Sequence, residues 1–241
     1  MKKIIEICKN DLKNYVNYRM LHMILIVAVV FALAMGFFDQ MNYLLFIYIS
    51  IFIFPVIIHS IMLFIEREEN NYLPKSLCDA KLSEVILAKY LSSLVLNLIP
   101  FILYTIILFF VLNVNFSFIM FLLVYILGLL VHIAIGYGIA IISKNHIKML
   151  AMYVAYIVIC SFVPFISLMN YIPDKLDYLF IFSPAYLSAI LLENVSFGYL
   201  FSDVFLIIIS IVLQLAVITA LMIWAIIPYY KEHVKKVCEL K

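Results

Sequence analysis

Charged residues are scarce in this chain. Only 12% of its 241 residues are Asp, Glu, Lys or Arg, whereas 68% are hydrophobic, and the mean hydropathy is +1.19. A soluble domain has about 25% charged residues, because polar surface must cover its core. The composition therefore excludes a water-soluble enzyme or a nucleic-acid-binding protein, and lipid must replace water around much of the chain.

Glycine and proline are also rare, with five and seven residues. Barrel strands would be short, alternating and separated by turn residues, so the long apolar segments favour helices. The four cysteines form no CxxC pair, and we expect free thiols without a disulfide, a metal site or a bound cofactor. They are Cys8, Cys78, Cys160 and Cys238.

Six apolar runs are long enough to cross a bilayer, which takes about 20 helical residues. A crossing segment must be helical here, because an open strand leaves its backbone polar groups unpaired in lipid. The sequence thus predicts an all-α, polytopic membrane protein with a single transmembrane domain over 1–241. The expected spans are about 21–38, 43–65, 90–112, 118–142, 149–169 and 204–228.

Basic residues indicate the orientation. With six spans, Lys175 is the only one of the 16 Lys and Arg residues on the side opposite the termini. Cytoplasmic loops carry the excess of Lys and Arg, so we expect both termini in the cytoplasm and the chain in a bacterial plasma membrane. The first apolar run is too long for a signal peptide, and we expect an uncleaved first span.

Two further segments have helical patterns but are not expected to cross. Residues 2–19 have apolar positions at helical spacing with lysines on the other flank, which predicts an interfacial helix; the alternative is a floppy basic tail. Ser183 followed by Pro184 is typical of a helix start. The apolar stretch after it, up to residue 193, predicts a short outer re-entrant helix before the last span, or else a loop packed on the bundle.

The spans lack the groups that drive ion-coupled transport. No Asp, Glu, Lys or Arg lies inside the six runs, whereas ion-coupled transporters generally bind the driving ion at mid-membrane. The chain also has no GxxxxGK[ST] phosphate loop. If it moves a substrate, the energy must come from a separate nucleotide-hydrolysing partner.

The joint 66–89 is where such a partner can push. Glu66, Arg67 and Glu68 follow the second run directly, and residues 73–87 mix apolar and charged positions as in a short amphipathic helix. Ser83 and Glu84 are expected to cap the third span, because a hydroxyl accepts from free amides and an acid favours a helix start.

These residues resemble the ABC-2 permease family. Its members have six spans, an inner amphipathic helix and a Glu-Arg-Glu signature after the second span, followed by a Glu and a closing Gly-Lys. This chain has Glu66-Arg67-Glu68, Glu84 and Ala88-Lys89 at that spacing. It departs at Asn70-Asn71-Tyr72, Cys78-Asp79 and Ala88, where the family has Gly-Thr-Leu, Thr-Pro and Gly.

The resemblance implies a coupling role for Glu66, Arg67, Glu68, Glu84 and Lys89. The partners it implies are a dimer of ABC ATPase subunits, which binds the ATP, a second permease copy or paralogue, and membrane lipids. The chain is most similar to small Gram-positive exporter permeases, so the expected cargo is an amphiphile such as a drug, an antimicrobial or amphipathic peptide, or a lipid-like molecule.

Among the uncharged polar residues in the runs, four are candidates for a function: His59, His132, Asn97 and Gln214. Each either lines a substrate path or joins helices by hydrogen bonds, and Gly128 and Gly136 share the face of His132 at helical spacing. Two other functions stay open. A passive channel or immunity protein needs no energy source, and an intramembrane metalloenzyme would need paired ligands that the two histidines lack.

Overall fold

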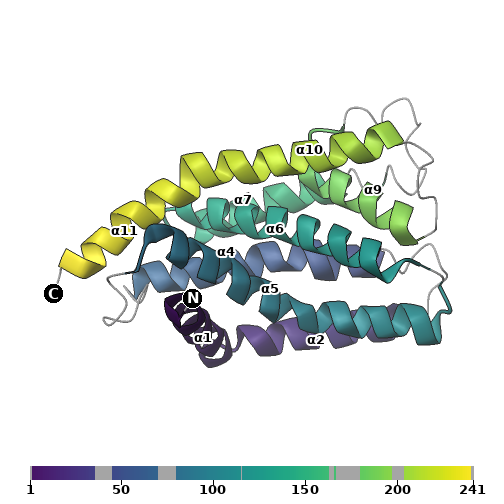
Figure 1. Cartoon of the computed structure of the whole chain (residues 1–241), viewed down its shortest axis with the longest axis horizontal. Helices are drawn as coiled ribbons and strands as arrows, with labels where there is room; N and C mark the ends of the chain where they lie inside the picture. The colour runs from purple at the N-terminus through teal and green to yellow at the C-terminus, as the bar shows by residue number, and fades with distance from the viewer. Residues whose placement is uncertain are drawn as a thin grey trace.

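The chain folds into a helical bundle, seen side-on in the computed structural model (Figure 1). The structure describes residues 2–35, 45–69, 80–114, 116–162, 166, 180–196 and 204–239. Every regular element in this part of the chain is a helix. The all-α prediction is confirmed, because segments this apolar must satisfy their backbone hydrogen bonds internally.

The helices follow the apolar runs, and several contain a π-helical stretch. The first six are α1 (Lys2–Asn17), α2 (Met20–Met35), η1 (Ile49–Ile53), α4 (Phe54–Glu68), α5 (Leu82–Ile106) and η3 (Ile107–Val111). The others are α6 (Phe118–Ile142), α7 (His146–Ala155), η4 (Tyr156–Phe162), α9 (Pro184–Ser196), α10 (Val204–Leu221), η6 (Met222–Ile226) and α11 (Ile227–Glu239).

Among the described residues, four helices are long and apolar enough to cross a membrane: Leu45–Glu68, Leu82–Val111, Phe118–Ile142 and Val204–Glu232. The bent pair α1 and α2 adds a fifth candidate. The predicted fifth run corresponds to the shorter helix His146–Phe162, and its remainder lies mostly outside the described residues. The structure thus supports an integral membrane protein with four to five candidate spans, and the count of six stays a prediction.

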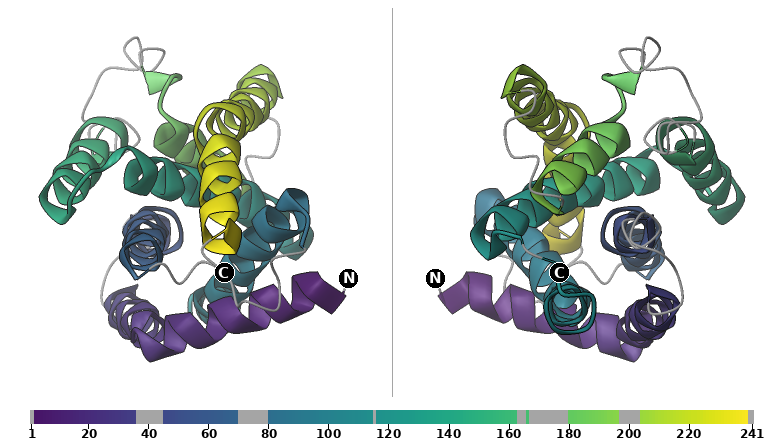
Figure 2. Two further views of the ribbon diagram at one scale, coloured as in Figure 1. Left: turned by 90° about the vertical axis from the view of Figure 1, so that its left-hand side faces the viewer. Right: turned by 90° about the vertical axis from the view of Figure 1, so that its right-hand side faces the viewer.

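Helix α1 lies across one end of the bundle, whereas α2 runs along it (Figures 1 and 2). The two helices are bent by 69°, and Arg19 at the bend has φ 60°, in the left-handed region. Helix α11 lies at the same end (Figure 1), which we call the terminal end. A helix that ends at Asn17 is therefore present where an interfacial helix was expected over 2–19, and its place at the membrane interface stays a prediction.

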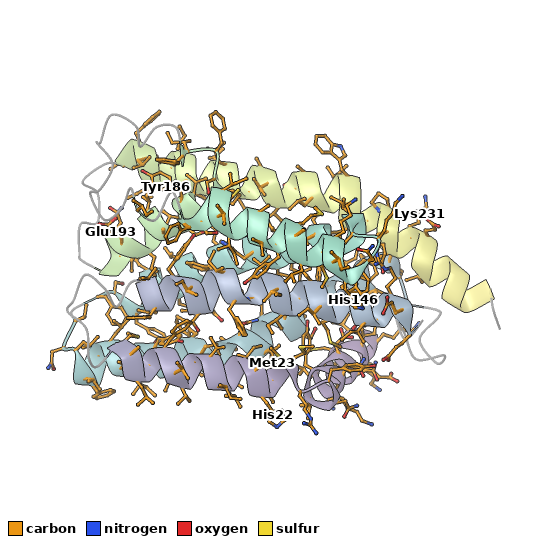
Figure 3. All side chains as sticks on the ribbon, turned by 180° about the vertical axis from the view of Figure 1, so that it is seen from behind. His22, Met23, His146, Tyr186, Glu193 and Lys231 are labelled. Carbon is orange, nitrogen blue, oxygen red and sulfur yellow. The ribbon has the colours of Figure 1, made fainter. Side chains whose placement is uncertain are left out.

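Helix α9 forms where a short outer helix was predicted. Ser183 caps it, since its Oγ accepts from the Tyr186 N–H at 3.2 Å, and Pro184 is its first residue. Tyr186 and Glu193 on α9 lie at the opposite end of the bundle from Lys231 on α11 (Figure 3). The helix packs against α6 and α10, and its apolar side chains are buried.

Helices α4 and α6 form the closest pair in the core. A Cβ added at Gly136 would lie 2.7 Å from the Val56 carbonyl oxygen, so only glycine permits this approach. The Ser60 hydroxyl donates to the Gly136 carbonyl oxygen at 2.8 Å and closes the contact. The small-residue face predicted on 118–142 thus packs against α4.

The start of the third span differs from the prediction. Helix α5 begins at Leu82, eight residues before the expected span, so residues 82–87 continue into the long helix. Ser83 is inside the first turn and is not the cap. Instead, the Glu84 carboxylate accepts from the Lys81 backbone N–H at 2.9 Å, because an acid in the first turn can reach back to a free amide. Residues 70–79 of the joint lie outside the described residues.

Candidate functional site at the terminal end

Three charged side chains meet inside the terminal end, and we call them the ion triad: Asp11 on α1, Glu66 on α4 and Lys89 on α5. The Lys89 Nζ lies 2.6 Å from Asp11 Oδ1, and 2.7 and 2.8 Å from the two carboxylate oxygens of Glu66. The exposed fractions of the residues are 1%, 3% and 3%. One ammonium therefore joins three helices that are distant in sequence.

Burying these charges is unfavourable unless they pair, and here each finds a partner. Removing one member of such a buried group typically destabilises a protein by about 3–5 kcal/mol, because the other charges stay behind uncompensated. Ser92 of α5 also donates to Asp11 Oδ2 at 3.3 Å. Burial raises the pKa of the Asp11 carboxyl above its ordinary value, and the Lys89 ammonium opposes that rise.

A second layer of polar side chains lies one turn further along α5. The Tyr15 hydroxyl hydrogen-bonds His59 Nδ1 at 2.8 Å, and the Asn97 amide hydrogen-bonds His59 Nε2 at 3.2 Å. Ser93 connects this layer to the ion triad, since its Oγ donates to the Lys89 carbonyl oxygen at 2.9 Å and lies 3.1 Å from the Tyr137 hydroxyl. All five side chains are buried.

The other predicted coupling residues separate from the ion triad. The Arg67 guanidinium donates to the Ala140 carbonyl oxygen of α6 at 3.0 Å and stacks 4.3 Å from the Phe64 ring centroid. The Glu68 carboxylate is half exposed, 3.3 Å from the His146 ring nitrogen Nε2. Glu84 caps α5, as described above. In the structure, Glu66 and Lys89 contact each other, whereas Arg67, Glu68 and Glu84 each contact other residues.

The four uncharged polar residues also divide. His59 and Asn97 form a hydrogen bond that joins helices α4 and α5. His132 Nδ1 instead bonds the Gly128 carbonyl oxygen of its own helix at 2.6 Å, and the ring stacks on Phe52. Both amide atoms of Gln214 are buried without a hydrogen-bond partner among the described residues. For His132 and Gln214, no hydrogen bond between described helices is formed.

Asp11 is the member of the ion triad that we did not predict. The expected apolar face of residues 2–19 is Ile4, Cys8, Leu12, Tyr15 and Val16. Tyr15 is buried and Ile4, Cys8 and Leu12 are partly buried, but Val16 is exposed, and the buried positions also include Ile7 and Asp11. The buried side of α1 is polar at Asp11 because it docks against polar groups of α5. The available signal was an acid at helical spacing from Tyr15.

The described residues offer no obvious site for a metal. No group of three or more His, Cys, Asp or Glu among them is placed to hold one. Cys8 and Cys160 are free thiols. The chemistry of the ion triad is accordingly electrostatic: it fixes the relative positions of α1, α4 and α5.

The comparisons with known proteins concern the whole chain. A search of curated proteins found no match. A family model described as ABC-2 family transporter protein matches residues 3–225, which include the bent helix pair, the ion triad and nearly all of α10 with η6. The match extends over nearly the whole sequence, and the chain therefore belongs to the ABC-2 transporter family, as a membrane component.

Proposed function

We propose that this chain is the permease subunit of an ATP-driven exporter that moves an amphiphile out of the cell. The observation that carries the proposal is the ion triad, which connects both ends of the joint 66–89 to α1. A passive membrane protein would have no need of buried charges at this position. The presence of buried charges in so apolar a chain fits a segment that transmits movement from an ATPase.

The mechanism follows from how the helices are joined. An ATPase that pushes on residues 66–89 displaces the end of α4 and the start of α5. Because Lys89 holds Asp11 and Glu66 at the same time, α1 moves with them as one body. The hydrogen bonds of Tyr15, His59 and Asn97 extend that body toward the middle of the bundle. Movement at the terminal end thereby reaches the helices around a substrate.

The partners follow from the same proposal. The terminal end faces the cytoplasm, as the lysines and arginines indicate, and a dimer of ABC ATPase subunits binds there. A second permease copy or paralogue completes the transporter, since one bundle of this size encloses little by itself. Apolar side chains such as Phe205 and Trp224 on α10 and η6 are 71% and 81% exposed, which suits contact with lipid or with that copy.

The experiment is reconstitution of the full chain with a candidate ATPase, which is recognised by its phosphate loop and is to be sought among the neighbouring genes. The two proteins should co-purify, and proteoliposomes should deplete a fluorescent amphiphile from the ATPase-facing leaflet only when ATP is present. A non-hydrolysing ATPase variant is the control. Depletion that is equally fast without ATP would instead support the passive channel or immunity protein.

A further inference from the structure

A cleft of about 900 Å³ opens between α6, η4, α9 and α10 with η6, apart from the ion triad. This volume lies within the range of about 300–1,000 Å³ that is usual for small-molecule sites. Its lining is mostly apolar and includes Tyr156, Cys160, Ala220 and Trp224. The views along the bundle show α7 and α10 on different sides of α6 (Figure 2).

Charge is confined to the terminal end of the cleft. Arg67 and Glu232 are the charged residues in its lining among the described residues. Glu232 is exposed, whereas Arg67 is half buried and has no carboxylate partner in the part of the chain that the structure describes. The Ala140 carbonyl oxygen accepts a hydrogen bond from one of the five guanidinium N–H groups of Arg67. The guanidinium therefore keeps N–H donors for a phosphate or carboxylate.

Part of the cleft wall is formed by irregular helix. Two π-helical segments, Tyr156–Phe162 and Met222–Ile226, contribute residues from opposite sides, and π-bulges occur often at functional sites.

We infer that this cleft takes up the transported amphiphile from the cytoplasmic leaflet, and that the amphiphile has an apolar tail and an acidic head. The inference rests on the proposed function and deepens it. The head binds the Arg67 guanidinium at the terminal end, and the tail lies along Ala220 and Trp224. Arg67 also follows Glu66 directly, so the residue that binds the head adjoins the ion triad.

The binding test uses Trp224, the only tryptophan of the chain. The full chain alone, in phosphatidylcholine nanodiscs, is titrated with a lysophosphatidic acid that has a brominated chain. We expect saturable quenching of Trp224, and none that saturates with a brominated alkyltrimethylammonium of equal length. Arg67→Gln should weaken binding at least about tenfold, as for loss of a charge-assisted hydrogen bond, and Arg67→Lys should restore part of it.

A second pair of variants fills space without touching charge. Ala220→Phe places a ring in the cleft and should abolish saturable quenching, whereas Ala216→Phe, at an exposed position of the same helix, should leave it unchanged. Unchanged binding in both Arg67→Gln and Ala220→Phe would overturn the assignment of the cleft. Weaker binding of the acid than of the ammonium would overturn the acidic head.

The uptake role is tested in proteoliposomes with the ATPase. Ala220→Phe should slow ATP-driven depletion of the acidic probe at least tenfold, and Ala216→Phe should not. If the probe binds in the cleft but the Ala220→Phe variant transports it at the wild-type rate, the ligand is a resident lipid and the uptake role is wrong. Absence of ATP-driven depletion in the wild-type complex contradicts the proposed function instead, because binding to the chain alone needs no ATP.

Discussion

The Nζ atom of Lys89 on α5 lies 2.6 Å from Oδ1 of Asp11 on α1, although 78 residues separate them in sequence. The same ammonium binds both carboxylate oxygens of Glu66. A helix that lies across the end of the bundle is thus fastened by charge to the two helices that border the joint 66–89. This contact makes α1 part of the segment on which an ATPase would push.

Lys89→Met should destabilise the protein strongly. It leaves Asp11 and Glu66 as two buried carboxylates with no cation between them, which costs about 3–5 kcal/mol. The midpoint of thermal unfolding in detergent should fall by about 6–20 °C for a chain of this length. Lys148→Met changes an exposed lysine in the same way and should leave the midpoint nearly unchanged. Equal midpoints for the two variants would mean that the ion triad adds nothing to stability.

Gly136→Ala should loosen the contact between α4 and α6. The added Cβ would meet the backbone oxygen of Val56 at 2.7 Å, and backbone cannot move away as a side chain can. We expect a loss of about 1–3 kcal/mol, measured by thermal unfolding. Gly138→Ala is the matched control, because its Cβ would meet only the flexible end of Leu221 at 3.3 Å. A larger loss for Gly138→Ala would contradict the packing described above.

Tyr15→Phe should destabilise more than Tyr230→Phe. The first removes a hydroxyl bonded to His59 Nδ1 at 2.8 Å and leaves that buried nitrogen with only the longer contact of 3.3 Å to the Ser93 hydroxyl, which costs about 0.5–1.5 kcal/mol. The second removes a buried hydroxyl that has no partner among the described residues, so it should be neutral or stabilising. The free energies of unfolding of the two variants are compared by chemical unfolding in the same detergent. A larger loss for Tyr230→Phe would mean that the hydrogen bonds of Tyr15 do not help to hold the helices together as the proposed moving body.

Much of the architecture could be predicted because lipid imposes strict rules. A segment as apolar as 118–142 has to form a helix, and α6 extends over Phe118–Ile142. Ser183 and Pro184 predicted the start of α9 from local chemistry alone. The apolar run placed the start of the third span at residue 90, because Lys89 is charged and its burial depends on the fold. The cap expected at Ser83 and Glu84 indicated a start nearer to Leu82, and Glu84 does cap α5.

The site was harder to predict because it depends on which helices meet. Glu66 and Lys89 were candidates through their resemblance to the ABC-2 permease signature, whereas Asp11 belongs to a different helix whose orientation only the fold determines. Arg67 is adjacent to Glu66 yet points to Ala140 and to the cleft, since successive residues on a helix face different directions. No periodicity in the sequence indicated that η4 and η6 line one cleft.

Transport per ATP hydrolysed by Glu66→Gln, in proteoliposomes with the ATPase, tests the coupling role of the ion triad most directly. The variant should fold, because Lys89 keeps Asp11 as a partner, but a neutral amide holds the ammonium far more weakly. We predict that ATP hydrolysis continues while transport per ATP falls at least about tenfold, and that Glu6→Gln, at an exposed position of α1, behaves as the wild type. A folded Glu66→Gln protein with the wild-type ratio of transport to hydrolysis would contradict the coupling role.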